Sequence, residues 1–131
     1  TIVATILVAL VALEHLYILW IEMFAWTTKG REVFKGALPD ELFERTRGLA
    51  ANQGLYNGFL AAGLIWGLTI ADPLWSLRVQ LFFLLCGVVL QSFLREVHTA
   101  ILHQTVRSSD RSILLKQGLP AILALFALLL R

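Results

Sequence analysis

The chain has 131 residues, of which 58% are hydrophobic and 15% are charged, and its formal net charge is +2. An average soluble domain carries about 25% charged residues, so this composition excludes an ordinary soluble domain and indicates an integral membrane protein. The basic residues are too few and too dispersed to form a nucleic-acid-binding surface. The single cysteine, Cys86, excludes an intrachain disulfide and a thiolate metal site, and we expect it to pack inside the protein.

Apolar runs and the residues that interrupt them predict four membrane-spanning helices. About 20 apolar residues cross a bilayer, so 131 residues have room for four spans and no separate soluble domain. The predicted spans are at about 2–26, 49–71, 77–102 and 113–130, and Asp72-Pro73 ends the second. The first run lacks a basic start and carries acids in its core, so we do not expect it to be cleaved as a signal peptide. The expected fold is all-α: an integral membrane four-helix bundle, a single domain of residues 1–131.

A short interfacial helix is predicted between the first and second spans. Pro39-Asp40-Glu41 is typical of a helix start, with proline in the first turn and acids at the positive end of the helix dipole. Leu42, Phe43 and Leu49 give this segment an apolar side, so we expect it to lie along the membrane surface. A plain solvated loop is the alternative.

Basic residues predict the orientation of the bundle. Eight of them lie in the two connections on one side and two lie on the other side. Under the positive-inside rule, both long connections are then cytoplasmic and both termini are outside the cytoplasm. The residues counted are Lys29, Arg31, Lys35, Arg45, Arg47, Arg107, Arg111 and Lys116 on the first side and Arg78 and Arg131 on the second.

The first span carries three ionisable residues, Glu14, His15 and Glu22. Such side chains are costly inside a membrane unless they face a partner, a cavity or a ligand, so they mark an interior site. His15 and Glu22 are seven residues apart and share one face of the helix, whereas Glu14 is rotated by about 100° from His15. Glu14 and His15 are therefore not expected to face the same groove.

Small residues recur along the second span. They stand every four positions and so lie near one face, at Ala50, Gly54, Gly58 and Ala62. A row of small residues lets the backbone of a neighbouring helix approach closely. Gly54, Gly58 and Ala62 therefore predict the packing face of this span.

Four polar side chains within six positions accompany this row. Asn52 and Tyr56 form one ridge, one turn apart, and Gln53 and Asn57 form another. Lipid tolerates so many polar groups poorly, so we expect them to face protein or ligand. Hydrogen bonds between helices and a ligand site both fit this pattern.

Matching depths along antiparallel spans predicts two polar layers. With both spans meeting the cytoplasmic interface, Glu22 is level with Gln53, and Glu14 and His15 are level with Ala61. The layer near the cytoplasm contains Glu22, Asn52, Gln53, Tyr56, Asn57, Arg95, Glu96, His98 and Gln117, and the deeper layer contains Glu14, His15, Trp66 and Gln91. The predicted ligand-binding residues are Glu14, His15, Glu22, Asn52, Gln53, Tyr56, Asn57 and Gln117.

Several chemistries compete for these residues. A carboxylate and an imidazole in an apolar site could exchange a proton with a substrate, which makes Glu14, His15 and Glu22 the candidate catalytic residues. Metal binding is not predicted, because no HExxH, ExxH or CxxC spacing occurs and His98 and His103 do not share a helix face. Proton-coupled transport is a third interpretation, since acids within membranes mark ion pathways. The sequence does not identify a cofactor.

Three stretches of the chain match a known pattern: Ile6 to His15 followed by Glu22-Met23-Phe24, Ala50 to Gly63, and Gln117 to Ala124. They are similar to the small bacterial membrane proteins known as domain of unknown function 1304. The Glu-His pair and the string Ala-Asn-Gln-Gly-Leu-Tyr-Asn-Gly are specific parts of this resemblance. The resemblance implies a four-helix inner-membrane protein without an established activity, and it supplies no catalytic residues.

The stretch from Gln91 to Ser112 departs from the family pattern, which has a shorter run of small residues there. We expect the third helix to be lengthened by about three turns and to carry Arg95, Glu96, His98 and His103. Such an extension past the cytoplasmic surface suits the docking of a partner, and a solvated connection is the alternative.

The function expected from these features is non-enzymatic. We expect a small multi-pass membrane protein that binds a lipid-like small molecule or serves as an accessory subunit of a membrane complex. The alternative is a membrane-embedded isomerase of a lipid or isoprenoid that uses Glu14, His15 or Glu22 for proton transfer, and a third is a small proton-coupled transporter. The expected partners are membrane lipids and either a larger membrane complex or further copies of the chain. The expected location is the inner membrane, with both termini outside the cytoplasm.

Overall fold

The computed structural model describes residues 1–101 and 119–130. Within 90–101 it describes the backbone and the side chain of Ser92, and within 119–130 it describes every side chain except those of Leu119 and Ala121. Every named element is a helix, so the expected all-α fold is confirmed for these residues. In chain order the elements are α1 (Ile2–Phe24), the π-helical turn η1 (Trp26–Gly30), α2 (Arg31–Val33), α3 (Leu42–Arg45), α4 (Arg47–Thr69), α5 (Pro73–Ile101) and α7 (Leu119–Leu129).

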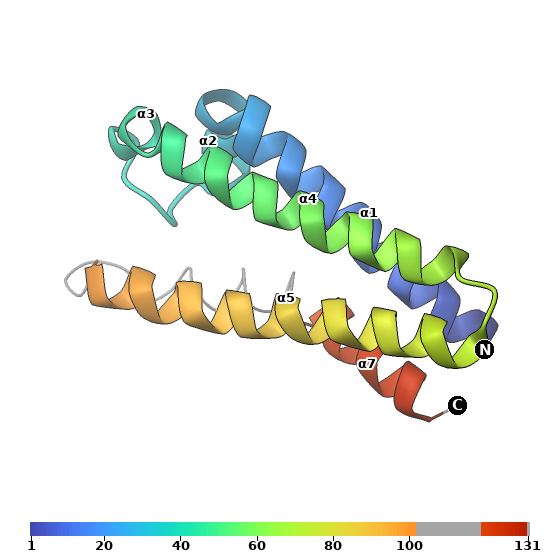
Figure 1. Ribbon diagram of the computed structural model, residues 1–131. Coiled ribbons are helices and arrows are strands. Elements are labelled where there is room, and N and C mark those ends of the chain that lie inside the picture. Colours follow the sequence, from blue (N-terminus) through green and yellow to red (C-terminus); the bar gives the residue numbers. More distant parts are fainter. Residues whose placement is uncertain (102–118, 131) are drawn as a thin grey trace.

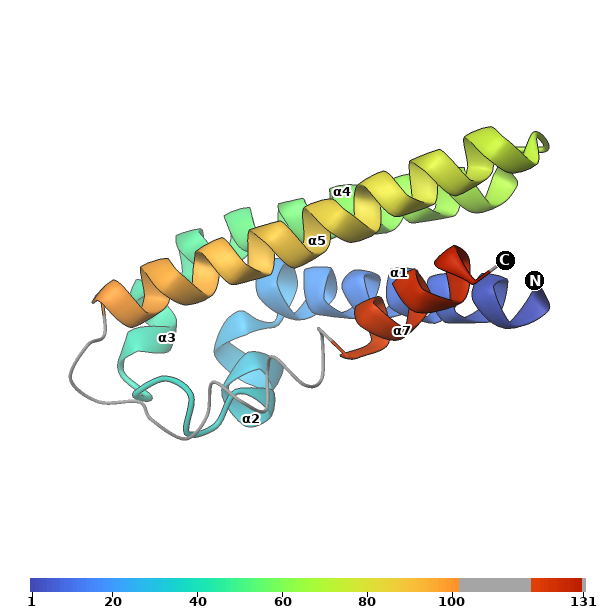
Figure 2. The same cartoon turned by 90° about the horizontal axis from the view of Figure 1, so that it is seen from below.

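The long helices lie alongside one another (Figures 1 and 2). α4 packs against α1 and α5, and α7 packs against the same two helices. The N-terminus, the last described residues and the turn between α4 and α5 lie at one end, which we call the hairpin end. The segments α2 and α3 lie at the opposite end, which we call the loop end. α1 therefore runs from the hairpin end to the loop end, α4 runs back, and α5 returns.

The helix boundaries differ from the predicted spans for physical reasons. α5 begins at Pro73, whereas the third span was expected to begin near 77. Asp72 is the N-cap of α5: its Oδ1 accepts a hydrogen bond from the backbone N–H of Trp75 at 2.8 Å, and proline fits the first helical position. α1 ends at Phe24, two residues before the expected boundary, because the chain there continues as the π-helical turn η1. Residues 113–118 of the fourth predicted span lie outside the described residues.

One helix in the described part of the chain is long and apolar enough to cross a membrane by length and composition. It is α1, whose 23 residues reach a mean hydropathy of 2.3. α4 also has 23 residues, but it includes Asn52, Gln53 and Asn57 among several glycines. The apolar part of α5, Pro73–Val89, is shorter. The four-span arrangement therefore stays a prediction.

The hydrophobic core lies toward the hairpin end and draws on all four long helices. Small and β-branched side chains of α1 pack against one buried leucine from each of the other three helices and against Ala124 of α7, which lets the helices close on one another. The buried members are Ala4, Val8, Val11, Ala12, Leu64, Leu84, Ala124 and Leu128. This core joins the two chain ends to the α4–α5 hairpin.

Two glycines of α4 bring α5 close to it near the hairpin end. A Cβ atom on Gly63 would collide with the ring of Phe83, and one on Gly67 would lie 2.7 Å from Cγ of Gln80. The backbone oxygen of Gly67 accepts hydrogen bonds from Oγ of Ser76 (2.8 Å) and from Nε2 of Gln80 (3.3 Å). The hairpin is thus held by close packing and by a buried hydrogen-bond network.

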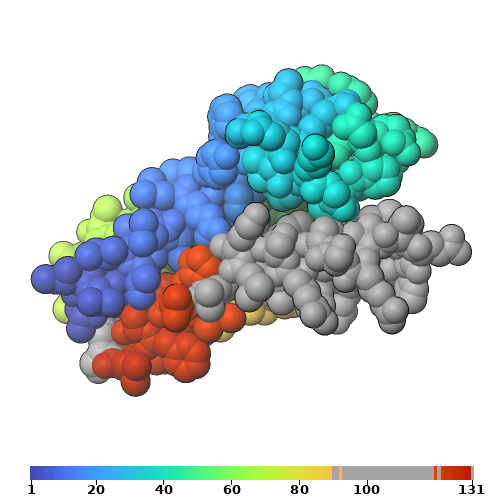
Figure 3. Space-filling model, turned by 180° about the vertical axis from the view of Figure 1, so that it is seen from behind, coloured from blue at the N-terminus to red at the C-terminus, as the bar shows by residue number. Residues whose placement is uncertain are grey.

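At the loop end, residues 26–46 fold over the ends of α1 and α4 (Figure 3). The ring of Trp26 lies 5.5 Å from that of Phe34 and 5.1 Å from that of Phe43, measured between centroids. Its Nε1 donates a hydrogen bond to Oγ1 of Thr46 at 3.1 Å. We call Trp26, Phe34 and Phe43 the aromatic cluster, and it ties the connection between α1 and α4 to both helices.

The predicted interfacial helix takes a different form from the expected one. α3 is a single turn, Leu42–Arg45. Phe43 is only 1% exposed because it packs into the aromatic cluster, whereas Leu49 is exposed on α4. The two residues therefore do not share an apolar surface, since the favourable burial of Phe43 against Trp26 turns it inward.

Candidate functional site

A carboxylate–amide pair links α1 to α4 in the half nearer the loop end. Nδ2 of Asn57 donates a hydrogen bond to Oε2 of Glu22 at 2.9 Å and another to the backbone oxygen of Gln53 at 3.2 Å. Asn57 is 8% exposed and Glu22 is half-buried. Glu22, Gln53 and Asn57, which the sequence placed in one layer, thus lie together. We call Glu22 and Asn57 the acid–amide pair.

The glycines of α4 explain why the two helices are close enough for this pair. A Cβ on Gly54 would lie 2.7 Å from Cγ of Met23 and 3.0 Å from Cβ of Glu22. One turn later, a Cβ on Gly58 would lie 2.5 Å from Cδ1 of Leu19. Both glycines therefore contact α1, as expected of a packing face.

Ala62, the third residue of the predicted packing face, is exposed, and the buried alanine at this level is Ala61. The reason is geometric. Residues spaced by four rotate by about 40° around an α-helix at each step. The row of small residues on α4 contacts α1 at Gly54 and has turned away from α1 by Ala62. The packing face of α4 is shorter than the repeat suggests.

His15 is buried where α1 approaches α4 and α5. It is 4% exposed, and its Nδ1 lies 2.8 Å from the backbone oxygen of Val11. A carbonyl oxygen only accepts, so Nδ1 carries the hydrogen and donates it. If Gly87 of α5 carried a Cβ atom, that atom would lie 3.9 Å from Nε2 of His15 and 3.6 Å from Cδ1 of Leu60. His15 is therefore close in depth to Leu60, within one residue of the level expected from the sequence.

Glu14 lies on another flank of α1. Glu14 is half-buried, and Val11 and Ile18, which lie between it and His15 around the helix, are buried. Its Oε2 is buried and has no hydrogen-bond partner within the described part of the structure. Glu14 does not join the acid–amide pair, so the three ionisable residues of α1 do not form one constellation there.

The two polar ridges of α4 differ in burial. Gln53 is half-buried and Asn57 is buried, whereas Asn52 is exposed and Tyr56 is 45% exposed. Asn52 and Tyr56 therefore do not lie in the contact between α1 and α4 with the acid–amide pair. The sequence predicted both ridges as one ligand-binding set. In the structure, Gln53 and Asn57 belong to an inner surface of α4, and Asn52 and Tyr56 belong to an outer one.

Several predicted site residues lie outside the described part of the structure. These are the side chains of Gln91, Arg95, Glu96 and His98 and the whole of His103 and Gln117. Among the residues that the structure does describe, no group of three or more His, Cys, Asp or Glu side chains could hold a metal ion.

Sequence reasoning missed the polar residues that fix the hairpin. Ser76 and Gln80 are 8% and 3% exposed, and Nε2 of Gln80 donates a hydrogen bond to Oγ of Ser76 at 2.7 Å. The available signal was their spacing of four residues within an otherwise apolar helix. Because both side chains bond to the backbone oxygen of Gly67, their role is structural.

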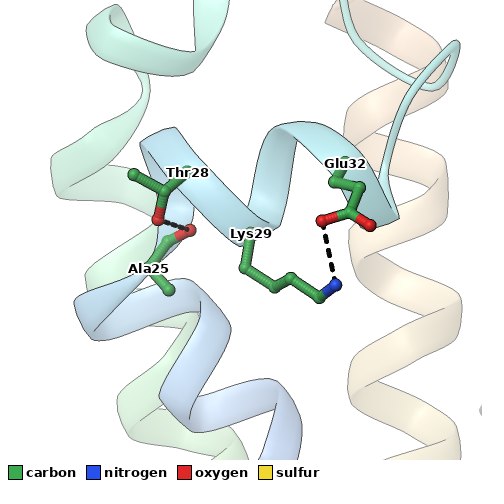
Figure 4. Close-up of polar contacts among 4 residues, drawn as sticks. All are labelled: Ala25, Thr28, Lys29 and Glu32. Atoms are coloured by element: carbon green, nitrogen blue, oxygen red, sulfur yellow. Dashed lines mark hydrogen bonds and ion pairs between the residues drawn. The ribbon is translucent and has the colours of Figure 1, made fainter.

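The loop end carries charged residues that pair locally. Nζ of Lys29 lies 2.9 Å from Oε2 of Glu32, beside the hydrogen bond from Thr28 to the backbone oxygen of Ala25 (Figure 4). The hydrogen bond and charge of Glu32 raise the pKa of Lys29. Arg31 bonds to Asp40 at 2.7 Å. These pairs are exposed, so they order the connection without forming a binding site.

Comparisons with known proteins agree with the sequence resemblance. The pattern of a family described as protein of unknown function, DUF1304, matches residues 9–129. The chain belongs to the DUF1304 family. One relative, "Uncharacterized protein YpaA" of Lactococcus lactis subsp. lactis (strain IL1403), is 33% identical over 136 residues, which cover 97% of each chain. No solved structure matches the chain. The DUF1304 match includes α4 and the part of α1 that carries Glu14, His15 and Glu22.

Proposed function

We propose that this DUF1304 protein is a multi-pass membrane protein whose four long helices form one bundle, and that it binds a lipid-like small molecule at the acid–amide pair. Large apolar side chains are exposed on the outer surface of every long helix. They include Ile6, Leu10 and Leu13 on α1, Phe59 and Ile65 on α4, Phe82 and Val89 on α5, and Phe126 and Leu129 on α7. Water disfavours such extensive apolar surfaces and lipid chains accommodate them.

Aromatic residues at both ends of the helices support this placement in a bilayer. Trp26 lies at the loop end, and Trp66 and Trp75 lie near the hairpin end, 58% and 60% exposed. The guanidinium of Arg78 lies 5.4 Å from the ring centroid of Trp75. Tryptophan is enriched at both membrane–water interfaces, so these residues fit the two edges of the hydrocarbon layer.

The loop end is the cytoplasmic end in this proposal, because it carries the basic connection between α1 and α4. Both termini, at the hairpin end, are then outside the cytoplasm of a bacterial inner membrane. The test is the accessibility of single cysteines, introduced in a Cys86→Ala background, to an impermeant thiol reagent on intact cells. A cysteine at Thr1 should react and one at Lys35 should not. The reverse result would contradict the orientation.

The observation that carries the binding proposal is the hydrogen bond from Asn57 to Glu22 between two helices. A carboxylate among apolar helices needs polar partners, and one amide does not use all its acceptor sites. Leu19 and Met23 pack against α4 beside the pair, and large apolar side chains cover the outside of α1, so the molecule that suits the pair has a polar head and a hydrocarbon body. The pair therefore supports a binder of lipid-like molecules.

Native mass spectrometry of the protein, extracted gently from its own membrane, tests this proposal. We expect a bound small molecule on the wild type that is lost in Glu22→Gln and retained in Glu44→Gln. Glu44 is exposed on α3 and so serves as a matched control for the loss of one carboxylate. A wild type without any bound small molecule would overturn the proposal. Co-purifying proteins in its place would instead favour an accessory subunit.

A further inference from the structure

One side of α4 is exposed in the half of the helix nearer the loop end. Its residues follow one another in steps of four, three and four, so they form a straight stripe along the helix. The buried residues Ala50 and Asn57 lie on the opposite side of α4. We call the exposed residues the outer stripe, which consists of Gly48, Asn52, Leu55 and Phe59.

Asn52 is the polar side chain of the outer stripe, and the membrane placement proposed above puts it inside the hydrocarbon layer. Nε1 of Trp26 bonds to Oγ1 of Thr46, so these two residues lie at the same level near one edge of the layer. Trp66 follows Thr46 by 20 residues. A helix of that length spans about 30 Å, which matches the thickness of the layer. Asn52 follows Thr46 by six residues and therefore lies about 9 Å inside this edge.

The side-chain amide of Asn52 needs hydrogen-bond partners at this depth. Lipid chains supply none, so an unpaired polar group is costly there. Thr69, another exposed polar residue of α4, satisfies its hydroxyl by donating to the backbone oxygen of Trp66 at 2.8 Å. Asn52 makes no side-chain hydrogen bond with the residues that the structure describes. Its donors and its acceptor are thus directed to a partner outside this part of the chain.

We propose that the outer stripe is the contact surface of a homodimer in the membrane, in which the Asn52 amides of two copies bond to each other. The inference rests on the proposed membrane placement and does not depend on ligand binding. Copies inserted in one orientation are related by a two-fold axis along the membrane normal, so their α4 helices run parallel and equal residues meet at equal depth. An amide donates and accepts, so two Asn52 side chains satisfy each other reciprocally.

The other features of the outer stripe fit a second copy of the same surface. Alternating steps of three and four residues are the spacing by which two parallel helices pack, and a single asparagine in such a seam fixes the register of a dimer. Gly48 lets the two backbones approach, and Leu55 and Phe59 supply apolar contacts on either side. The stripe contains no charged residue, so two copies meet without repulsion between like charges.

Cross-linking of single cysteines in the membranes of cells that express the full chain tests the surface. In a Cys86→Ala background, Phe59→Cys lies on the outer stripe and Leu13→Cys lies on α1, and both original side chains are 60% exposed. Phe59 is 13 residues from Thr46 and Leu13 is 13 residues from Trp26, so the two thiols lie at nearly the same depth. With a short, membrane-permeant bis-maleimide, we expect Phe59→Cys to form a dimer at least about tenfold faster than Leu13→Cys.

Substitutions of Asn52 test the pairing of the amides. Asn52→Leu removes both reciprocal hydrogen bonds, so at low expression the cross-linking rate of Phe59→Cys should fall about tenfold. Asn52→Gln keeps an amide and should keep the rate within about threefold. Tyr56→Phe removes an exposed hydroxyl one turn away and off the stripe, and it should leave the rate unchanged. Leu55→Cys, on the stripe, should cross-link as Phe59→Cys does.

Each other outcome contradicts a stated part of the proposal. Equal cross-linking of Phe59→Cys and Leu13→Cys, or none at either position, would overturn the homodimer. A full rate in Asn52→Leu, or an equal loss in Tyr56→Phe, would overturn the amide pairing and with it the choice of a second copy. Modification of both cysteines by an impermeant thiol reagent would show that the membrane placement is wrong. Ligand binding is measured separately in Glu22→Gln, so failure of the dimer does not contradict the binding proposal.

Discussion

The two halves of the bundle differ in what holds the helices together. Toward the hairpin end, α4 and α5 meet through Gly63 and Gly67, and Ser76 and Gln80 bond to the backbone between them. Toward the loop end, α4 meets α1 through Gly54, and a single acid–amide hydrogen bond joins their side chains. One half satisfies its polar groups internally. The other carries polar side chains of α4 that are exposed or half-buried, at Asn52, Tyr56 and Gln53.

The two halves therefore differ in how far their polar side chains find partners within the described part of the chain. Buried polar groups that find all their partners within the chain fix one geometry. Polar groups with partners only in part leave hydrogen-bonding capacity for another molecule. The same helix, α4, takes part in both arrangements, because its glycines face α1 in one half and α5 in the other.

The largest expected effect comes from filling the tightest contact of the hairpin half. Gly63→Val would force Cβ and two methyl groups into the ring of Phe83, and overpacking of this kind costs about 1–3 kcal/mol or more. We expect Gly63→Val to lower the unfolding free energy by about 3 kcal/mol, measured by denaturant titration in mild detergent. Ala62→Val adds the same methyl groups at the neighbouring, exposed position and should change the unfolding free energy by less than about 0.5 kcal/mol. Similar losses in both variants would contradict the close α4–α5 contact.

A smaller loss is expected when the hydrogen bonds of the hairpin are removed without overpacking. Gln80→Leu keeps most of the side-chain volume but deletes the bonds to Gly67 and Ser76. Hydrogen bonds between helices are worth about 0.6–1.7 kcal/mol in membranes, so we expect a loss of about 1–2 kcal/mol. Thr69→Val, which removes an exposed bond within one helix, is the control and should be nearly neutral. Unfolding in the same detergent compares the two variants.

A substitution at the loop end should lower the unfolding free energy less than a substitution in the hairpin. Trp26→Phe keeps an aromatic ring against Phe43 but removes the donor to Thr46, and a single neutral hydrogen bond contributes about 0.5–1.5 kcal/mol. We expect a loss within that range in thermal or denaturant unfolding. Trp66→Phe, at an exposed position where the indole has no hydrogen-bond partner among the described residues, is the control. A loss above that of Gln80→Leu would reverse the comparison between the two halves.

The smallest effect is expected at the exposed pair of Lys29 and Glu32. Glu32 raises the pKa of Lys29, so any stabilisation from the pair is present at neutral pH and is lost as the pH rises through the pKa of Lys29 in the folded protein. We expect Glu32→Gln to lower the pKa of Lys29, measured by NMR titration of its side chain. The unfolding temperature at pH 7 should not change, because solvent screens exposed pairs. A lower pKa of Lys29 in the wild type than in Glu32→Gln would contradict the pair.

Much of the helical framework could be predicted from the sequence, because it depends on composition and on local signals. The apolar run of α1 and the glycine repeat of α4 gave the two helices and their contact near Gly54. The start of α5 was missed because Asp72 both follows α4 and caps α5, and a sequence pattern cannot separate these roles. The shape of the loop end was missed because Phe43 packs against Trp26, which lies 17 residues earlier in the chain.

The candidate site could be predicted only in part, because residue type does not determine which flank faces the interior. Pairing Glu22 with the layer of Gln53 and Asn57 followed from depth alone. Depth alone also placed Asn52 and Tyr56 in this layer, but it could not predict that both side chains are exposed on α4. Ser76 and Gln80 were missed because their partner is a backbone oxygen at Gly67, which leaves no mark in the sequence.

The division of roles between the two halves is tested most directly by measuring stability and ligand binding together in two variants. Glu22→Gln and Gln80→Leu are compared with the wild type by denaturant unfolding and by native mass spectrometry of the bound small molecule. We expect Glu22→Gln to lose the bound molecule while keeping its unfolding free energy within about 1 kcal/mol. Gln80→Leu should lose stability but keep the bound molecule under conditions in which it stays folded. If the bound molecule is lost in proportion to stability in both variants, binding only reports folding and the proposed site is wrong.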